Sequence, residues 1–390
     1  MSPLSPSCRT HVCLFTDSLE PSGVGEHMLT LAGELLGRFR LSFVCPPGPG
    51  GDPFLARAEA MGLEAVGLAV NRPDLRGGFC RWLRARGVSV FHGHAGIGWE
   101  GHDGVYAARQ ADIPVVMRTE HLPYLLTDPW QQSEHARLVE AVDCLLAVSQ
   151  EARSTFEDAG LPTHKLRAVQ NGIHLCPVRK GVPDLRRELG LAASVKVVLT
   201  VGRYTDQKGH CYLIDAVPSV CAAVPDVHFV WVGDGPLEDN LREQVSARGA
   251  GGCVHFLGKR SDVADLLADS DLFVLPSLFE GLPAVILEAM AAGRPVVATA
   301  VCGSSEAVRD GETGRLVPPR SPAALAEAIT DALAQPARAA EWGAAGRRRF
   351  DQQFTAARMA RETASLYEEL LSKAPGEEGL QARHGAGCGG

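Results

Sequence analysis

Two carboxylates, Glu280 and Glu288, stand on either side of a Gly-Leu-Pro turn at 281–283. The apolar run 271–275 before them predicts a buried strand. Pro283 suits the first position of a helix, where the missing N–H of proline has no partner in any case. Glu288 would then lie about 7–8 Å along the helix axis from that proline. A helix N-terminus favours an anion, so the pair could bracket an anionic ligand and accept hydrogen bonds from its hydroxyl groups. Solvated surface charge is the simpler interpretation of two glutamates taken alone.

Two cations, Arg203 and Lys208, follow the near-continuous apolar run 195–201, which predicts another buried strand. Arg together with Lys at the end of a strand can stabilise the charge that develops on a departing diphosphate without a metal ion. A surface loop with two basic residues is the alternative. A Gly-Asp-Gly-Pro turn at 233–236 follows a further strand, and alone it would be only a turn.

The first half of the chain alternates short apolar runs with helix-compatible stretches, which indicates a parallel sheet covered on both faces. A glycine-rich loop with Gly23 and Gly25 follows the first run and precedes a helix from about residue 25. Met28 stands where a third glycine would complete a dinucleotide-binding fingerprint, so that fingerprint is not supported. The strands are expected at 12–15, 41–45, 64–68, 88–91, 115–117 and 144–148.

Histidines follow two of these expected strands. His92 and His94 come after the strand at 88–91, and His121 comes a few residues after the strand at 115–117. A metal site built from His92, His94 and His102 is disfavoured, because their flanks are glycine-rich and no carboxylate–cysteine set is near. We expect these histidines in loops that line a ligand site.

Composition bounds the class of protein. The chain of 390 residues is longer than one typical core, which favours two domains. The net charge of −8 argues against a general nucleic-acid binder. No apolar run reaches the roughly 20 residues that span a bilayer, and the N-terminus lacks a signal-peptide core. The 11 cysteines form no C-x-x-C pair, which favours a reducing cytoplasm. We expect buried cysteines at Cys13, Cys45, Cys144 and Cys221.

The segment Pro276-Ser277-Leu278-Phe279-Glu280-Gly281-Leu282-Pro283, continued by Glu288 to Thr299, resembles the donor-site signature of retaining GT-B glycosyltransferases of family 4. The similarity extends from about residue 12 to 371 and is most specific over 195–317. It implies the GT-B fold, an α/β architecture of two Rossmann-like doubly wound domains facing across a cleft. The expected parts are an acceptor-side domain at 10–180 that also receives the last helix at 355–371, a donor domain at 190–350 and a disordered tail at 374–390.

The resemblance also implies roles for single residues. Arg203, Lys208, Glu280 and His121 would form the catalytic set, with the two cations on the departing diphosphate and Glu280 on donor-sugar hydroxyls. Glu288 would accept hydrogen bonds from the ribose, and Glu120 with His121 would meet the acceptor. For Glu120, a solvated loop charge is an equally open interpretation. The residues expected at the donor are Gly23, Gly25, Gly233, Gly235, Pro236, Ser277, Gly281, Leu282 and Glu288.

Two departures from the family pattern are visible. His174 stands where relatives have aspartate, and the segment 302–306 keeps only Gly303 and Glu306 of the usual Gly-Gly-x-Pro-Glu. The triplet Asp269-Ser270-Asp271 has the D-x-D form that binds a metal in another glycosyltransferase class. Here it leads into a strand, so we expect no metal and no cofactor.

The sequence therefore predicts transfer of a sugar, with retention of anomeric configuration, from a nucleotide sugar to a sugar, lipid-linked or small-molecule acceptor. No nucleic acid is expected as a partner. A cytoplasmic location is expected. The basic stretch at 81–86 could make peripheral contact with anionic lipid at the inner face of the membrane, but a solvated helix face is the favoured interpretation. Two alternatives stay open: a sugar-nucleotide epimerase of the same fold, which needs no acceptor, and a non-catalytic nucleotide-sugar binder.

Overall fold

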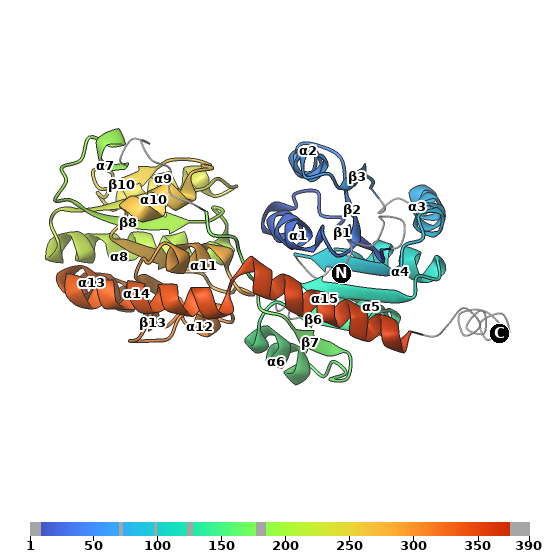
Figure 1. Cartoon of the computed structure of the whole chain (residues 1–390). Coiled ribbons are helices and arrows are strands. Elements are labelled where there is room, and N and C mark those ends of the chain that lie inside the picture. Colours follow the sequence, from blue (N-terminus) through green and yellow to red (C-terminus); the bar gives the residue numbers. More distant parts are fainter. Residues whose placement is uncertain (1–8, 70–72, 97–99, 123–127, 177–184, 375–390) are drawn as a thin grey trace. The chain divides into compact units, whose positions relative to one another are not determined.

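The computed structural model describes residues 9–69, 73–96, 100–122, 128–176 and 185–374. The chain divides into two compact units (Figure 1), one formed by 1–171 with 356–390 and the other by 172–355. Each unit is built around one fully parallel sheet. The expected tail at 374–390 lies outside the described residues except for its first residue.

The first sheet has the strand order β3-β2-β1-β4-β5-β6-β7. Its strands are β1 (His11–Phe15), β2 (Arg40–Cys45), β3 (Glu64–Gly67), β4 (Val90–Ala95), β5 (Val115–Glu120), β6 (Cys144–Ala147) and β7 (Leu166–Ala168). The helices of this unit are α1 (Ser22–Leu35), α2 (Asp52–Ala60), α3 (Pro73–Ala85), α4 (His102–Gln110), α5 (Pro129–Ala141), α6 (Gln150–Asp158) and α15 (Ala356–Lys373).

Both faces of the first sheet are covered. Helices α1, α2 and α15 pack on one face in a core that includes Val12, Met117 and Tyr367. Helices α3, α4 and α5 pack on the other face against Phe15 and Phe91. Strands buried on both faces explain why the apolar runs are continuous rather than alternating. The last helix, α15 (red in Figure 1), follows the second unit in the chain and belongs to the first unit.

The second sheet has the order β10-β9-β8-β11-β12-β13. Its strands are β8 (Lys196–Val201), β9 (Val227–Val232), β10 (Val254–Phe256), β11 (Leu272–Leu275), β12 (Val296–Thr299) and β13 (Gly314–Val317). The helices are α7 (Leu185–Glu188), the 3-10 turn η2 (Asp206–Lys208), α8 (His210–Ala223), α9 (Glu238–Ala247), α10 (Val263–Asp269), α11 (Ala284–Ala291), α12 (Ser304–Ala307), α13 (Pro322–Ala334) and α14 (Pro336–Gln353).

Most expected elements are present, and the differences lie at their ends. Strands β4 and β5 run on to Ala95 and Glu120, several residues beyond the apolar runs that predicted them. Helix α1 begins at Ser22 rather than near Gly25, and α11 begins at Ala284, so Pro283 is the cap residue and not the first helical one. Strand β7 was not expected from the sequence.

Two smaller features concern a helix cap and the buried cysteines. Ser149 caps α6, since its hydroxyl accepts a hydrogen bond from the Ala152 N–H at 3.0 Å. Three of the four cysteines expected in the core are buried, but Cys221 is only partly buried. Its thiol lies 3.3 Å from that of Cys253.

Candidate active site

In the second unit the expected donor residues gather where the strand order reverses. Strand β8 pairs with β9 on one side and with β11 on the other. Strands β9 and β10 extend the sheet on the first side, and β11, β12 and β13 extend it on the second, so the strand order reverses between β8 and β11. Ligands of open parallel sheets bind at such a point, beyond the carboxyl ends of the strands. The segments that follow β8 and β11 are 202–209 and 276–283, and the Leu278 N–H donates to the Gln207 carbonyl at 2.7 Å, which joins them.

Glu280 is the centre of this group. Its side chain is buried, and its Oε1 lies 2.6 Å from the Lys208 Nζ in an ion pair. The Ser277 hydroxyl donates to the same oxygen at 2.6 Å. The Ser277 carbonyl in turn accepts from the Thr299 hydroxyl, and the Gln207 amide donates to the Phe279 carbonyl at 3.0 Å. The carboxylate is therefore held in one orientation, with its charge compensated by an ammonium on the neighbouring loop.

The turn with Gly233 and Gly235 is built against the segment after β8. The φ angles of these two glycines are +145° and +154°, which side chains rarely adopt. A Cβ on Gly233 would lie 2.0 Å from the Gly202 carbonyl oxygen, and one on Gly235 would lie 2.7 Å from the Tyr204 nitrogen. The backbone thus passes directly over residues 202–204, which places Pro236 at the same edge of the sheet.

The other expected donor residues of this unit differ in exposure. Gly281 and Leu282 are buried in the loop before α11, and Glu288 is partly buried on α11. Arg203 is exposed at the end of β8. The structure therefore brings Lys208, Ser277 and Glu280 into direct contact, and the roles given to all of these residues stay predictions.

The D-x-D triplet is used inside the fold. The Asp271 carboxylate pairs with Arg186 at 2.5 Å and with Lys196 at 3.3 Å, and it accepts from the Val197 N–H. The Asp269 carboxylate accepts from the Leu185 N–H at 2.9 Å. These contacts connect the segment before β11 to α7 and to the beginning of β8, so the triplet has a structural function here.

In the first unit the strand order reverses between β1 and β4. His92 and His94 lie inside β4 and are fully buried, so the expectation that they belong to a loop was wrong. A strand can hold them because the polar atoms of His92 are satisfied: one ring nitrogen bonds the Tyr367 hydroxyl and the other the Thr119 hydroxyl, each at 2.6 Å. Burial, followed by the neighbouring His27, lowers the pKa of His92 to about 3.

His121 follows β5 directly, and its N–H donates to the Ala95 carbonyl at 2.9 Å. One of its ring nitrogens lies 3.3 Å from a ring nitrogen of His94. Its pKa is well below the usual range because it is buried, with His27 the next contribution. His121 is therefore a neutral imidazole that can donate or accept a hydrogen bond.

Glu120 is the last residue of β5 and is buried, not a solvated loop charge. Its Oε1 lies 2.6 Å from the Arg118 Nε and 3.5 Å from the His135 Nε2. Burial alone would raise the pKa of Glu120, but Arg118 and His135 outweigh it and lower the pKa to about 2. The carboxylate is committed to these partners, and its predicted part in acceptor binding remains untested.

The glycine-rich loop of the first unit is also different from the expectation. Gly23 and Gly25 lie in the first turn of α1, not in the loop before it. A Cβ on Gly25 would lie 2.6 Å from the Phe54 ring, so this glycine permits close packing of α1 on α2. Sequence reasoning gave no role to Gln207, Thr299 or His27. No short motif marks them, because each meets its partners through the fold.

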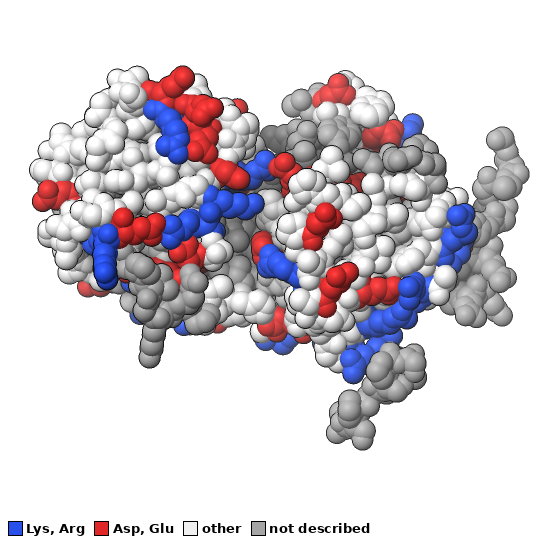
Figure 2. All heavy atoms as spheres, turned by 90° about the horizontal axis from the view of Figure 1, so that it is seen from above, with Lys and Arg blue, Asp and Glu red and all other residues white. Residues whose placement is uncertain are grey.

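On the face that Figure 2 shows, basic and acidic side chains are interspersed. The basic stretch on α3 has acidic partners: Arg84 pairs with Asp112 at 3.1 Å, and Arg86 with Glu64 at 2.7 Å. Among the helices that the structure describes, none combines the length and the apolar character needed to cross a membrane.

Known proteins match this chain over nearly its whole length. The α-maltose-1-phosphate synthase of Mycolicibacterium smegmatis is 30% identical over 382 residues, which cover 89% of this chain and 95% of that protein. The GDP-mannose-dependent α-(1-6)-phosphatidylinositol monomannoside mannosyltransferase of the same organism is 28% identical, with 86% and 92% covered.

Solved structures show the same fold. The Anabaena protein Alr3699/HepE in complex with UDP superposes with a TM-score of 0.80 at 21% identity, covering 92% of this chain and all of that one. The sucrose-phosphate synthase of Thermosynechococcus elongatus gives 0.79 at 22% identity, with 94% of this chain covered. The two sheets are thus those of the GT-B fold. Residues 195–335 match the family described as glycosyl transferases group 1 and residues 21–175 match glycosyltransferase family 4, and the chain belongs to these glycosyltransferases.

Proposed function

We propose that this glycosyltransferase moves a sugar from a nucleoside-diphosphate sugar to an acceptor hydroxyl with retention of anomeric configuration. The observation that carries the proposal is the contact of Lys208, Ser277 and Glu280 at the point where the second sheet reverses its strand order. An ammonium and a fixed carboxylate at one place suit a ligand that carries both a diphosphate and sugar hydroxyls.

In this proposal Lys208 changes partner during the reaction. The donor diphosphate competes with Glu280 for the ammonium, and Arg203 joins Lys208 in stabilising the charge on the leaving group. Glu280 stays anchored by Ser277 and accepts a hydrogen bond from a donor-sugar hydroxyl, while Glu288 accepts from the ribose. The acceptor hydroxyl attacks on the face that the diphosphate leaves, and its proton passes to a phosphate oxygen.

The remaining parts of the proposal concern ligands and location. Arg203 and Lys208 supply the positive charge, so transfer requires no metal ion. His121 and Glu120 of the first unit serve the acceptor, and Gly23 and Gly25 the donor. The relatives support a nucleotide-sugar donor, since one is described as GDP-mannose-dependent and one solved neighbour was obtained with UDP-glucose. The acceptor is a sugar, a lipid-linked sugar or a small molecule reached from the cytoplasm.

The first experiment is a thermal shift with UDP, GDP, ADP and their sugars, each with and without EDTA. One nucleotide should stabilise the protein, equally in both conditions. The matching sugar nucleotide is then incubated with candidate acceptors, and the anomeric coupling of the product is read by NMR. A shift that EDTA abolishes would refute the metal-free part, and an inverted product would refute retention.

Two controls separate the alternatives. Conversion of the donor sugar to an epimer without any acceptor would favour an epimerase. Arg203→Ala is expected to keep the fold and lose transfer, and an unchanged rate of transfer would refute its role. The matched control is Arg242→Ala, which removes an exposed arginine that pairs with Glu238 on α9. No transfer with any donor that binds would support the non-catalytic binder.

A further inference from the structure

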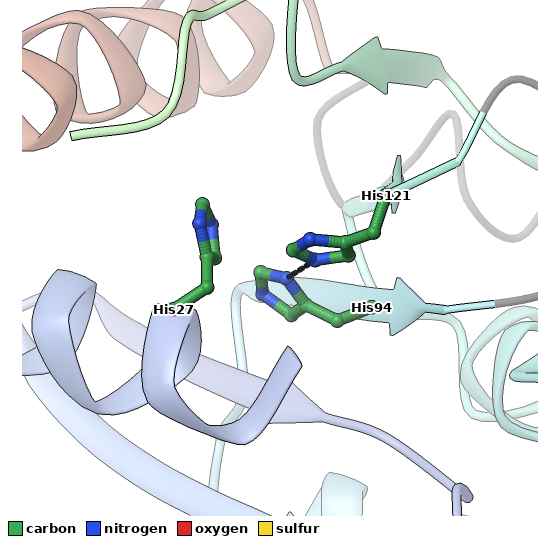
Figure 3. A group of neighbouring side chains, drawn as sticks. All are labelled: His27, His94 and His121. Carbon is green, nitrogen blue, oxygen red and sulfur yellow. Dashed lines mark hydrogen bonds between the residues drawn. The ribbon is translucent and has the colours of Figure 1, made fainter. Parts of the chain in front are cut away.

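Three histidines from separate elements of the first unit meet in one place (Figure 3). His27 is on α1, His94 is in β4 and His121 follows β5. One ring nitrogen from each lies within 4.8 Å of the other two. The rings do not stack on one another: His27 is nearly perpendicular to His121, with centroids 4.7 Å apart, and tilted by 56° from His94.

Hydrogen bonding within the protein does not account for this cluster. His94 is fully buried, its Nδ1 faces the His121 Nε2 at 3.3 Å, and its Nε2 has no hydrogen-bond partner among the described residues. The contact at 3.3 Å is a long one for a hydrogen bond. A cation bound between the His94 Nδ1 and the His121 Nε2 would explain why these two ring nitrogens face each other.

The three rings are in the form that binds metals. Burial lowers the pKa of His27 to about 4, against the effect of a hydrogen bond with Asn171, and the pKa of His94 and of His121 lies well below the usual range. Neutral imidazole is the ligand form of histidine, so no proton has to be removed at neutral pH.

The spacing suits a tetrahedral ion. Metal–nitrogen bonds of about 2.0–2.1 Å at tetrahedral angles place neighbouring ligand atoms about 3.3–3.4 Å apart. The His94 Nδ1 and the His121 Nε2 are already 3.3 Å apart. The partly exposed His27 offers the third nitrogen, and one ligand nitrogen of each histidine lies within 4.8 Å of the other two. Three protein ligands leave a fourth position for water, as in open zinc sites.

The surroundings favour such a site. His92, fixed by Tyr367 and Thr119, lies with its ring centroid 4.1 Å from that of His94 and limits its movement. The nearby cation Arg118 is paired with Glu120, so the charge that a metal ion would meet is largely compensated. A side-chain hydrogen bond with Asn171 also restrains His27.

We propose that His27, His94 and His121 form a binding site for a divalent transition-metal ion of the Zn²⁺, Co²⁺ or Ni²⁺ class. Imidazole ligands select these ions over Mg²⁺ and Ca²⁺. Binding occupies His121, so the ion acts as an inhibitor of transfer and not as a requirement for it. Only this consequence rests on the proposed function, because the metal site itself lies entirely within the first unit.

The test uses the full chain without a histidine tag, stripped with EDTA and freed of it. Cobalt chloride is titrated in while the visible absorption of tetrahedral Co²⁺ is recorded, and zinc chloride is added to displace it. We expect one Co²⁺ per chain and a spectrum that Zn²⁺ abolishes. The variants His27→Asn and His94→Asn should each weaken Co²⁺ binding by at least tenfold.

The matched control is His228→Asn, because His228 and His255 form another histidine pair, with ring nitrogens 2.7 Å apart, in the second unit. This variant should bind Co²⁺ as the unmodified protein does. No tetrahedral spectrum at millimolar Co²⁺, or the same loss in His228→Asn, would overturn the proposal. If His94→Asn does not fold, Co²⁺ binding by the His27→Asn variant still tests the proposal, because His27 is only partly buried.

The consequence for activity is measured separately. Zn²⁺ should inhibit sugar transfer by the unmodified enzyme, and His27→Asn should need at least tenfold more Zn²⁺ for the same inhibition. Equal inhibition of both would refute the inhibitory role. The cobalt spectrum needs neither donor nor acceptor, so a protein that binds Co²⁺ but transfers no sugar would keep the metal site and refute only the proposed function.

Discussion

Removing the ammonium of Lys208 should destabilise the second unit, and removing its partner as well should restore much of the loss. The perturbation is the variant Lys208→Met, which keeps the length of the side chain and deletes its charge. Glu280 then remains buried, with only the Ser277 hydroxyl bonded to its Oε1. A carboxylate left in the interior without its cation is penalised, because burial disfavours the charged form.

The magnitude follows from the burial of the pair. Breaking a buried ion pair from one side costs about 3–5 kcal/mol. The Lys208 side chain is 16% exposed and that of Glu280 is 5% exposed, so water screens the pair slightly and we expect about 2–3 kcal/mol. For Glu280→Gln we expect about 1–2 kcal/mol, since the amide keeps a partner in Ser277. The double variant should be more stable than the sum of the two predicts by about 2 kcal/mol.

The assay is chemical and thermal unfolding of the four proteins of this cycle. For a unit of this size, 1 kcal/mol corresponds to a shift of about 2–4 °C in Tm. The matched cycle uses Lys373→Met and Glu369→Gln, an exposed pair on α15 whose side chains are 65% and 41% exposed, where the coupling should be much smaller because water screens the charges. Additive effects at Lys208 and Glu280 within about 0.5 kcal/mol would refute the reasoning.

Three further results are expected. Gly303→Ala should abolish the thermal shift by nucleotide, because φ at Gly303 is +75° and a Cβ there would lie 2.0 Å from the Gly281 carbonyl oxygen; an undiminished shift would contradict this. Tyr367→Phe should lower the free energy of unfolding by about 1 kcal/mol through the lost bond to His92, as measured with denaturant, and no change would show that the bond contributes nothing. Acid should destabilise the first unit, because the folded-state pKa of His27 (about 4) and of His92 (about 3) lies below the ordinary 6.5, so the unfolded chain takes up these protons first. The contribution of these two histidines to the free energy of unfolding should be constant above pH 7 and should fall as the pH drops through 6.5 toward 4. At pH 5.5 the expected loss is about 1.4 kcal/mol per histidine, measured by urea titration. A free energy of unfolding that does not change between pH 7 and 5 would refute the pKa shifts.

The second unit was the more predictable one, because its chemistry is local in the sequence. Residues 276–283 contain Ser277, Glu280 and the turn before α11, so the strand, the loop and the helix that position them are read from one stretch. Lys208 could be placed with them because both stretches follow apolar runs that predict buried strands. Its direct ion pair with Glu280 could not be foreseen, since that depends on β8 and β11 being neighbours.

The first unit was less predictable because its polar side chains are buried inside strands. An apolar run marks a strand only as far as its side chains are apolar, so β4 and β5 were expected to end before His92 and Arg118. His92 can be buried because its partner Tyr367 comes from α15, far away in the sequence. That bond is a property of the assembled fold, which no pattern along the chain records. Arg118 instead pairs with Glu120, two residues further along the same strand.

The point where the strand order reverses therefore carries charged side chains in the second unit and neutral ones in the first. At the β8–β11 reversal the loops present a cation beside a fixed carboxylate, so a ligand there must offer negative charge to Lys208 and hydroxyl groups to Glu280. Near the β1–β4 reversal the chain places neutral imidazoles, which offer lone pairs and no charge. A diphosphate finds no charge compensation among neutral imidazoles, whereas a sugar hydroxyl or a soft cation can use their hydrogen bonds and lone pairs. Under the proposed function, the second unit holds the donor diphosphate, and a metal ion and an acceptor would compete for His121.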